Sequence, residues 1–236
     1  MLERLDYVKV APRRILDAGS GPGREAARLA ARYKPASVVA LDFSLPMLRL
    51  ARRRLFEKRR FVCGELARLP IAASAVDLVW SNMALHWADA EAALREFGRV
   101  LAPEGLLMFS TLGPDTLKEL RAAAGAARVH AFADMHDLGD MLVAAGFAAP
   151  VMDMEVLTFT YRDAQALLAD LRASGQTSAR ADRPRGLAGA GLLKRIISVA
   201  GTRATFEVVY GHAWKGAPRK RADGRDIVQF RSPRAR

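Results

Sequence analysis

The strongest constraint on the fold is a regular alternation of strand-like and helix-like segments between residues 14 and 111. Short apolar runs, typical of buried strands, are separated by stretches with helical periodicity. Strands that alternate with helices form a parallel sheet with helices on both faces and right-handed crossovers. We therefore expect an α/β fold, with its first five strands at residues 14–18, 37–42, 60–63, 76–81 and 105–111.

A glycine-rich turn follows the first expected strand, in the sequence Asp17-Ala18-Gly19-Ser20-Gly21-Pro22-Gly23. Glycines allow positive φ and let a ligand lie against bare backbone, and the helix behind them offers free N–H groups. The spacing differs from the G-x-G-x-x-G of dinucleotide sites, and the Asp17 carboxylate would repel a pyrophosphate but attract an ammonium group. An ordinary turn between a strand and a helix is the alternative interpretation.

The pattern D-x-G-x-G-x-G resembles the first motif of class I S-adenosylmethionine (SAM) methyltransferases. The resemblance implies a Rossmann-like, mostly parallel sheet of seven strands and SAM as the cofactor. It places Asp17 near the methionyl amine of SAM. The turn around the methionyl and ribose parts then consists of Gly19, Ser20, Gly21 and Gly23.

Two further acidic residues follow the next expected strands. Asp42 ends the second strand, where a carboxylate can accept hydrogen bonds from both ribose hydroxyls. Capping of the following helix is the alternative role for Asp42. Glu65 stands after the third strand, where related enzymes carry Asp and contact adenine, although it could simply be solvated in a loop. The resemblance adds three cofactor contacts to this end of the sheet: Phe43, Met47 and Leu66.

The fourth expected strand ends in polar and aromatic residues. Ligands of open α/β sheets collect at the carboxyl ends of the strands, so Asn82 and His86 are candidates for the methionyl end of SAM. Trp87 is a candidate for the substrate entrance. Simple packing of the His86 and Trp87 rings is the alternative.

Composition excludes several other functions. Cys63 is the single cysteine and the four histidines lack metal-site spacing, so we expect neither a disulfide nor a metal. No apolar run reaches 18 residues and no signal-peptide pattern occurs, which predicts a cytoplasmic protein that does not bind a membrane. The net charge of +12 predicts an acidic partner. We expect a protein rather than nucleic acid, because the basic runs contain few aromatic residues for base stacking.

Three stretches outside the parts common to SAM enzymes point to one family. They are residues 109–121 (FSTLGPDTLKELR), 134–140 (DMHDLGD) and 210–214 (YGHAW). Together they resemble the malonyl-[acyl-carrier protein] O-methyltransferases of biotin synthesis. The resemblance implies methyl transfer from SAM to the free carboxylate of a malonyl thioester on an acidic acyl carrier protein, giving the methyl ester that primes pimeloyl synthesis. A carboxyl group with a pKa of about 4 is already ionised at pH 7, so we expect no catalytic general base.

The expected domain organisation is one methyltransferase domain over residues 1–216, followed by a basic, disordered tail at 217–236. Its core comprises residues 12–112, 150–161 and 203–216, and a helical cap at 163–202 precedes the last strand. We expect substrate contacts from Trp87, Arg185, Tyr210, His212 and Trp214, with core packing as the alternative for the last strand. The cap cations expected to dock the carrier protein are Arg180, Arg183, Arg185, Lys194 and Arg195.

One departure from the family pattern lies at the N-terminus. Family members carry a further N-terminal helix and a tyrosine that close over SAM, whereas here about a dozen residues precede the first strand, so that lid is expected to be missing. Two alternative functions stay open. One is the related arginine hydroxylase of respiratory complex I assembly, and the other is a non-catalytic scaffold that keeps the glycine turn for folding.

Overall fold

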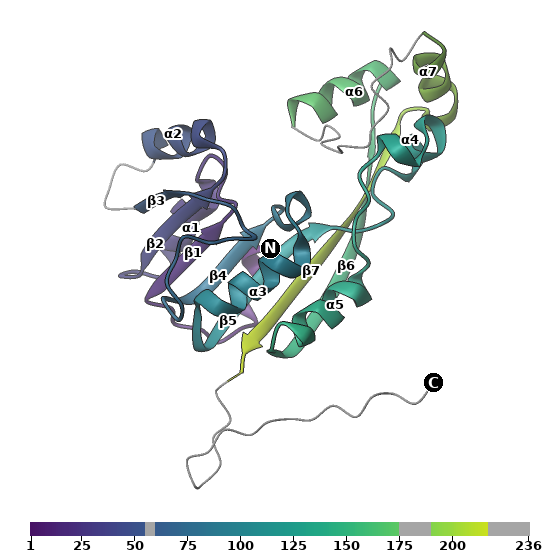
Figure 1. The fold of residues 1–236 in the computed structure, drawn as a ribbon. Helices are drawn as coiled ribbons and strands as arrows, with labels where there is room; N and C mark the ends of the chain where they lie inside the picture. The colour runs from purple at the N-terminus through teal and green to yellow at the C-terminus, as the bar shows by residue number, and fades with distance from the viewer. Residues whose placement is uncertain (55–59, 175–189, 217–236) are drawn as a thin grey trace, which may run out of the picture.

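The computed structural model describes residues 1–54, 60–174 and 190–216, and it contains one seven-stranded sheet in the order β3-β2-β1-β4-β5-β7-β6 (Figure 1). β7 runs antiparallel to both of its neighbours, while β1 to β5 pair in parallel. The expected mostly parallel α/β sheet is therefore confirmed. The strands are β1 Arg14–Ala18, β2 Ser37–Asp42, β3 Arg60–Cys63, β4 Val76–Asn82, β5 Leu101–Leu112, β6 Phe147–Thr160 and β7 Arg203–Lys215.

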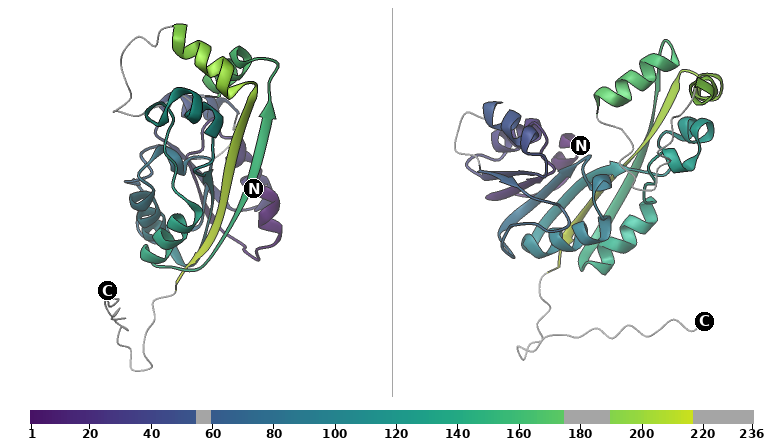
Figure 2. Two further views of the ribbon diagram at one scale, coloured as in Figure 1. Left: turned by 90° about the vertical axis from the view of Figure 1, so that its right-hand side faces the viewer. Right: turned by 45° about the horizontal axis from the view of Figure 1, so that its top comes forward.

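Helices cover both faces of this sheet. On one face, α1 (Arg24–Arg32), α2 (Leu45–Arg54) and the short η1 (Leu2–Asp6) pack against a core that includes Leu29 and Trp80. On the other face, α3 (Ala90–Val100) and α5 (Met135–Ala144) bury Phe97 and Leu142. The left view of Figure 2 shows the N-terminal segment and α5 on opposite sides of β6 and β7. Apolar side chains at helical spacing on each helix account for these two layers.

A group of small helices stands at the far end of the β6 and β7 strands (Figure 1). The last β5–β7 pair is Leu112 with Val208, so the first residues of β7 extend beyond the end of β5. Leu117, Leu167 and Ala204 form a separate small core there. The cap thus rises from the carboxyl edge of the parallel strands. It contains α6 (Ala164–Ala173), α7 (Ala190–Arg195) and η4 (Ile196–Ala200), and α4 (Lys118–Ala124) and η3 (Ala126–Arg128) lie beside it.

Two strands are longer than the sequence pattern indicates. β5 begins at Leu101 and not at residue 105; Leu101 pairs with Val76, but the next paired residue is Leu106, so the residues between them form a bulge inside the strand. β6 begins at Phe147, before the expected core segment at 150–161, and its register shifts between Ala148 and Val151. Both irregular stretches contain a proline, which cannot donate to the ladder and interrupts the pattern of a strand.

Some expectations fall outside the described residues. They include the basic tail at 217–236 and the cap cations Arg180, Arg183 and Arg185. Within the described ranges, no helix is long and apolar enough to cross a membrane.

Candidate functional site

The glycine turn lies at the point where the order of the parallel strands reverses, between β1 and β4. Ligands of doubly wound sheets bind at the carboxyl edge near this point. The N–H groups of Gly19 and Ser20 both donate to the Leu41 carbonyl, at 2.8 and 2.9 Å, which folds the turn over the end of β2. Gly19 has a φ of +80°, and a Cβ built on it would lie 2.2 Å from the Cβ of Ala84. Only glycine therefore lets this turn meet the loop after β4.

Asp17 places a buried carboxyl group under that turn. Its side chain is 1% exposed, and its Oδ2 has no hydrogen-bond partner among the described residues. Burial, together with the nearby carboxylates of Glu25 and Asp42, raises the pKa of Asp17 to about 8, although a backbone hydrogen bond from Ala26 opposes the shift. A buried acid with an unused oxygen fits a cationic amine, which would stabilise its ionised form. A phosphate would not fit beside three carboxylates.

Asp42 holds the turn and the start of α2 together. Its Oδ2 accepts the N–H of Gly21 and its Oδ1 accepts the N–H of Ser44, each at 2.8 Å. Asp42 therefore fixes the residue before α2, although, among the described residues, it accepts no N–H from the helix itself. Each oxygen keeps a second lone pair, so the same carboxylate can also accept ribose hydroxyls. The ribose contact stays a prediction.

The expected adenine side of the site carries exposed apolar groups. Phe43 is 72% exposed and Met47 is 40% exposed, directly after β2. Glu65 is also exposed after β3, and Leu66 is half-buried. Exposed aromatic and thioether groups are suited to cover a flat ring. These adenine contacts remain predictions.

A pocket of about 470 Å³ opens beside the glycine turn, on the α1 side of the sheet. The Ser110 hydroxyl on β5 donates to the Asn82 side-chain oxygen at 2.6 Å. Tyr210, on the neighbouring strand β7, is the register partner of Ser110. Glu25 of α1 lines the same pocket. The structure thus brings the predicted Asn82 and Tyr210 together. Sequence reasoning missed Ser110, although the two polar residues Ser110 and Thr111, directly after the apolar run of β5, could have indicated a site.

The other predicted substrate residues do not form one group. His212 lines an adjacent pocket with Met108 and Val151, which Tyr210 also lines, and Trp214 packs against the core on the α1 side. Trp87 is 43% exposed, beside His130. Arg185 lies outside the described residues.

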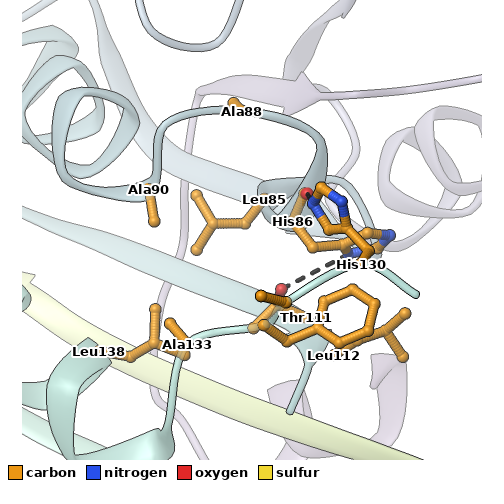
Figure 3. Close-up of a pocket in the computed structure, with 11 residues that line it drawn as sticks. Leu85, His86, Ala88, Ala90, Thr111, Leu112, His130, Ala133 and Leu138 are labelled. Carbon is orange, nitrogen blue, oxygen red and sulfur yellow. Dashed lines mark hydrogen bonds between the residues drawn. The ribbon is translucent and has the colours of Figure 1, made fainter. Parts of the chain in front are cut away.

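His86 lines a third pocket, of about 170 Å³, with Thr111 and His130 (Figure 3). It sits in η2 (Leu85–Trp87), and its Nδ1 lies 3.5 Å from the Thr111 hydroxyl. His130 Nε2 lies 3.2 Å from the His86 carbonyl oxygen. Burial, with a contribution from His130, lowers the pKa of His86 to about 4, so the ring is neutral at pH 7. His130 comes from an irregular segment before α5, and no periodic pattern in the sequence marks it.

Comparison with known proteins places this geometry among methyltransferases. A family model described as "Methyltransferase domain" matches residues 16–109. A malonyl-[acyl-carrier protein] O-methyltransferase from Methylovorus sp. (strain MP688) is 50% identical over 256 residues, covering 100% of this chain and 86% of that protein. The solved YcgJ protein from Bacillus subtilis has a TM-score of 0.67 at 18% identity, covering 91% of this chain and 97% of that one.

A second solved structure adds a bound ligand. Phosphoethanolamine N-methyltransferase 2 from Haemonchus contortus, in complex with S-adenosyl-L-methionine, has a TM-score of 0.57 at 21% identity. The match covers 91% of this chain and 51% of that chain. At these identities the two solved structures establish the shared fold.

Proposed function

Since the chain belongs to the malonyl-[acyl-carrier protein] O-methyltransferase family, we propose that it transfers the methyl group of SAM to the free carboxylate of a malonyl thioester on an acyl carrier protein. This reaction is a step of biotin synthesis in the family that the sequence resembles. The observation that carries the cofactor assignment is the buried Asp17 carboxyl, whose Oδ2 has no partner among the described residues.

The residues at the strand ends fit SAM part by part. Asp17 would hold the methionyl amine, the glycine turn would lie along the methionyl chain, and Asp42 would accept the ribose hydroxyls. Asn82, fixed by Ser110 at 2.6 Å, faces the pocket beside the turn and would bind the polar methionyl end. No metal is needed for this arrangement, and the described residues contain no cluster of three or more metal-binding side chains.

The chemistry requires little acid–base assistance. Bound SAM supplies an electrophilic methyl group on a positively charged sulfur, and a carboxylate oxygen takes it with S-adenosylhomocysteine as the leaving group. A malonyl carboxyl group is already ionised at pH 7, so no protein group has to remove a proton. The protein contributes by aligning the carboxylate oxygen with the methyl carbon and by excluding water from the pocket.

The charge of the chain suits an acidic carrier protein. The net charge is +12, which creates a field that attracts an acidic partner. Lys194 and Arg195 are exposed at the end of α7 in the cap, at the carboxyl edge of the sheet. We place the docking surface for the carrier protein on these cap cations, from which a flexible prosthetic arm would reach the strand ends.

Methyl transfer is favoured over both alternatives. The curated relatives over nearly the full chain are O-methyltransferases, not hydroxylases. A scaffold that kept the glycine turn only for folding would gain nothing from a buried carboxyl group with an unused oxygen, because such a group destabilises the folded state.

Two measurements on the full chain test the proposal. Isothermal titration with SAM measures cofactor binding, and mass spectrometry of malonyl-carrier protein detects the gain of one methyl group. We expect SAM binding and a methylated product, and no product with acetyl-carrier protein, which lacks the free carboxylate. SAM binding without methylation of malonyl-carrier protein would reject this substrate but keep the cofactor site.

A further inference from the structure

The pocket at His86 lies next to the cofactor side of the sheet, although it opens toward the opposite face. Ala84, which touches the glycine turn, is two residues before His86. Ser110, which bonds Asn82, is one residue before Thr111. Consecutive residues of a strand point to opposite faces, so Ser110 and Thr111 connect the two sides at the same level of the sheet. A group that enters this pocket therefore ends beside the strand edge where the methyl group is transferred.

The hydrogen bonds around the two histidines define what this pocket offers. His130 Nε2 must carry a proton to bond the His86 carbonyl, so its Nδ1 is an acceptor in the neutral ring. The Thr111 hydroxyl lies 3.5 Å from His86 Nδ1, and the neutral His86 ring carries one proton. We assign the tautomer in which Thr111 donates to Nδ1, which leaves the proton on Nε2 and makes Nε2 a donor. Within the described part of the chain, neither His86 Nε2 nor His130 Nδ1 has a hydrogen-bond partner, and both atoms are buried. Buried polar atoms of this kind are normally satisfied, which indicates a bound group.

The remaining wall of the pocket limits the size and polarity of that group. It consists mainly of small or apolar side chains, namely Leu85, Ala88, Ala90, Phe132, Ala133 and Leu138. Figure 3 shows both imidazole rings at one end of the pocket, above Thr111, with Ala133 and Leu138 toward the other. The pocket has a volume of about 170 Å³, which is smaller than the 470 Å³ pocket on the other face and suits a short acyl group.

We propose that this pocket binds the carboxylate-bearing acyl end of the substrate, with His86 Nε2 as the donor that orients the carboxylate. The inference deepens the proposed function, on which it rests, by naming the residue that holds the reacting group. His130 Nδ1 accepts the amide N–H that follows the thioester in the prosthetic arm of a carrier protein. His130 also positions His86 through the bond to its carbonyl.

A neutral donor suits this reaction better than a lysine or arginine would. The carboxylate loses its negative charge as the ester forms, so a full positive charge beside it would stabilise the starting state more than the transition state. A neutral imidazole N–H orients the carboxylate oxygen through a weaker electrostatic interaction than a charged side chain would make. The surrounding apolar wall keeps water away from the same oxygen.

The test compares two substitutions of His86 that keep different nitrogen positions. His86→Gln retains a donor near the Nε2 position, and His86→Asn retains only the Nδ1 position. We expect His86→Asn to raise KM for malonyl-carrier protein about tenfold or more. His86→Gln should stay within about threefold of wild type, and Kd for SAM should be unchanged in both. His136→Asn is the matched control, because His136 is exposed at the start of α5.

Nuclear magnetic resonance of ¹⁵N-histidine gives a readout that does not depend on turnover. With wild-type protein saturated with S-adenosylhomocysteine, malonyl-N-acetylcysteamine should shift the His86 Nε2 resonance, and acetyl-N-acetylcysteamine should not. Equal shifts with both compounds, or an unchanged KM in His86→Asn, would overturn the inference. A loss of SAM affinity in both variants would also overturn it, by assigning His86 to the cofactor. Failure of wild type to methylate malonyl-carrier protein would reject the proposed function separately.

Discussion

Glu207 and Thr116 hold each other through two hydrogen bonds that run in opposite directions. The Thr116 hydroxyl donates to the Glu207 carbonyl oxygen at 3.2 Å, and the Glu207 N–H donates to the same hydroxyl at 3.1 Å. The Glu207 carboxylate also accepts the N–H of Asp115 at 2.7 Å. These bonds fasten the turn after β5 to β7 at the base of the cap, which gives the stretch Gly113-Pro114-Asp115-Thr116 a structural role.

Thr116→Val should destabilise the protein, because it leaves the buried N–H of Glu207 without its partner while keeping the side-chain shape. We expect a loss of about 1–3 kcal/mol in the free energy of unfolding, measured by urea denaturation. Thr116→Ser keeps the hydroxyl, so its free energy of unfolding should fall clearly less than that of Thr116→Val. Equal stability of Thr116→Val and wild type would show that the two bonds contribute nothing.

Asp17 should make the stability of the ligand-free protein fall as the pH rises. Its folded-state pKa of about 8 lies above the unfolded value of 3.8, so the folded state binds the proton more tightly. The free energy of unfolding therefore falls as the pH rises from about 4 to about 8, because over this range the Asp17 carboxyl is ionised in the unfolded chain but still protonated in the folded one. Asp17→Asn should remove this part of the pH dependence and raise Tm at pH 8 without SAM. Matching Tm–pH profiles for the two proteins would contradict the assignment.

SAM binding should release a proton at pH 7. With a pKa of about 8, the Asp17 carboxyl is about nine-tenths protonated before binding, and an ammonium group beside it favours the ionised form. Calorimetric titration in buffers of different ionisation enthalpy should report close to one proton released. Asp17→Asn should bind SAM more weakly and release none. A release that persists in this variant would point to another group.

Gly19→Ala should weaken SAM binding by at least tenfold. The added Cβ would lie 2.2 Å from the Ala84 Cβ, and the φ of +80° is unfavourable for alanine, so the turn and the loop after β4 must separate. The affinity for SAM is measured by calorimetry. Gly139→Ala is the control, since its Cβ meets only the flexible Met152 side chain at 3.9 Å, inside helix α5. It should retain SAM binding and gain stability. If Gly19→Ala bound SAM with the affinity of the wild type, the close approach of the glycine turn to Ala84 would be refuted.

Charge reversal in the cap should weaken carrier-protein binding. The double variant Lys194→Glu/Arg195→Glu should have a KM for malonyl-carrier protein several-fold above that of the wild type. Added salt should reduce this difference in KM, because it screens the charges. Kd for SAM should not change. Arg53→Glu on α2 is the control, because α2 stands at the other end of the sheet from the cap (Figure 1). An equal rise in KM for this control would indicate a general charge effect instead of a docking surface.

The sheet was predictable because its buried strands are short apolar runs with clear boundaries. β1, β2 and β3 match the expected ranges, and β4 is one residue longer. The extensions of β5 and β6 were not predictable, since Pro103 and Pro150 read as the end of a strand in the sequence. In the structure, pairing resumes past each irregularity because residues such as Phe147 are buried against the core.

The site was predictable where a residue type at a strand end implies its chemistry, as for Asp17 and Asp42. Contacts between distant segments cannot be deduced from a residue type at a strand end alone. His130 reaches His86 from an irregular loop, and Ser110 acquires its role only through the pairing of β5 with β4. The expected substrate residues on β7 share one face of the strand but differ in surroundings, because Tyr210 and His212 line a pocket whereas Trp214, further along the strand, packs against the core.

The β7 strand pairs with β5 in one unbroken register from Val208, past Tyr210, to Trp214, and its first residues continue into the base of the cap. The cap helices bury their apolar residues mainly against one another and against the first residues of β7, separately from the two main cores. Exchanges of the described cap residues between 161 and 174 or 190 and 202 therefore leave the side chains of the main cores in place. If the carrier protein docks on the cap as we propose, the preference for a carrier can be altered by changing the cap while the strand ends proposed to bind SAM stay the same.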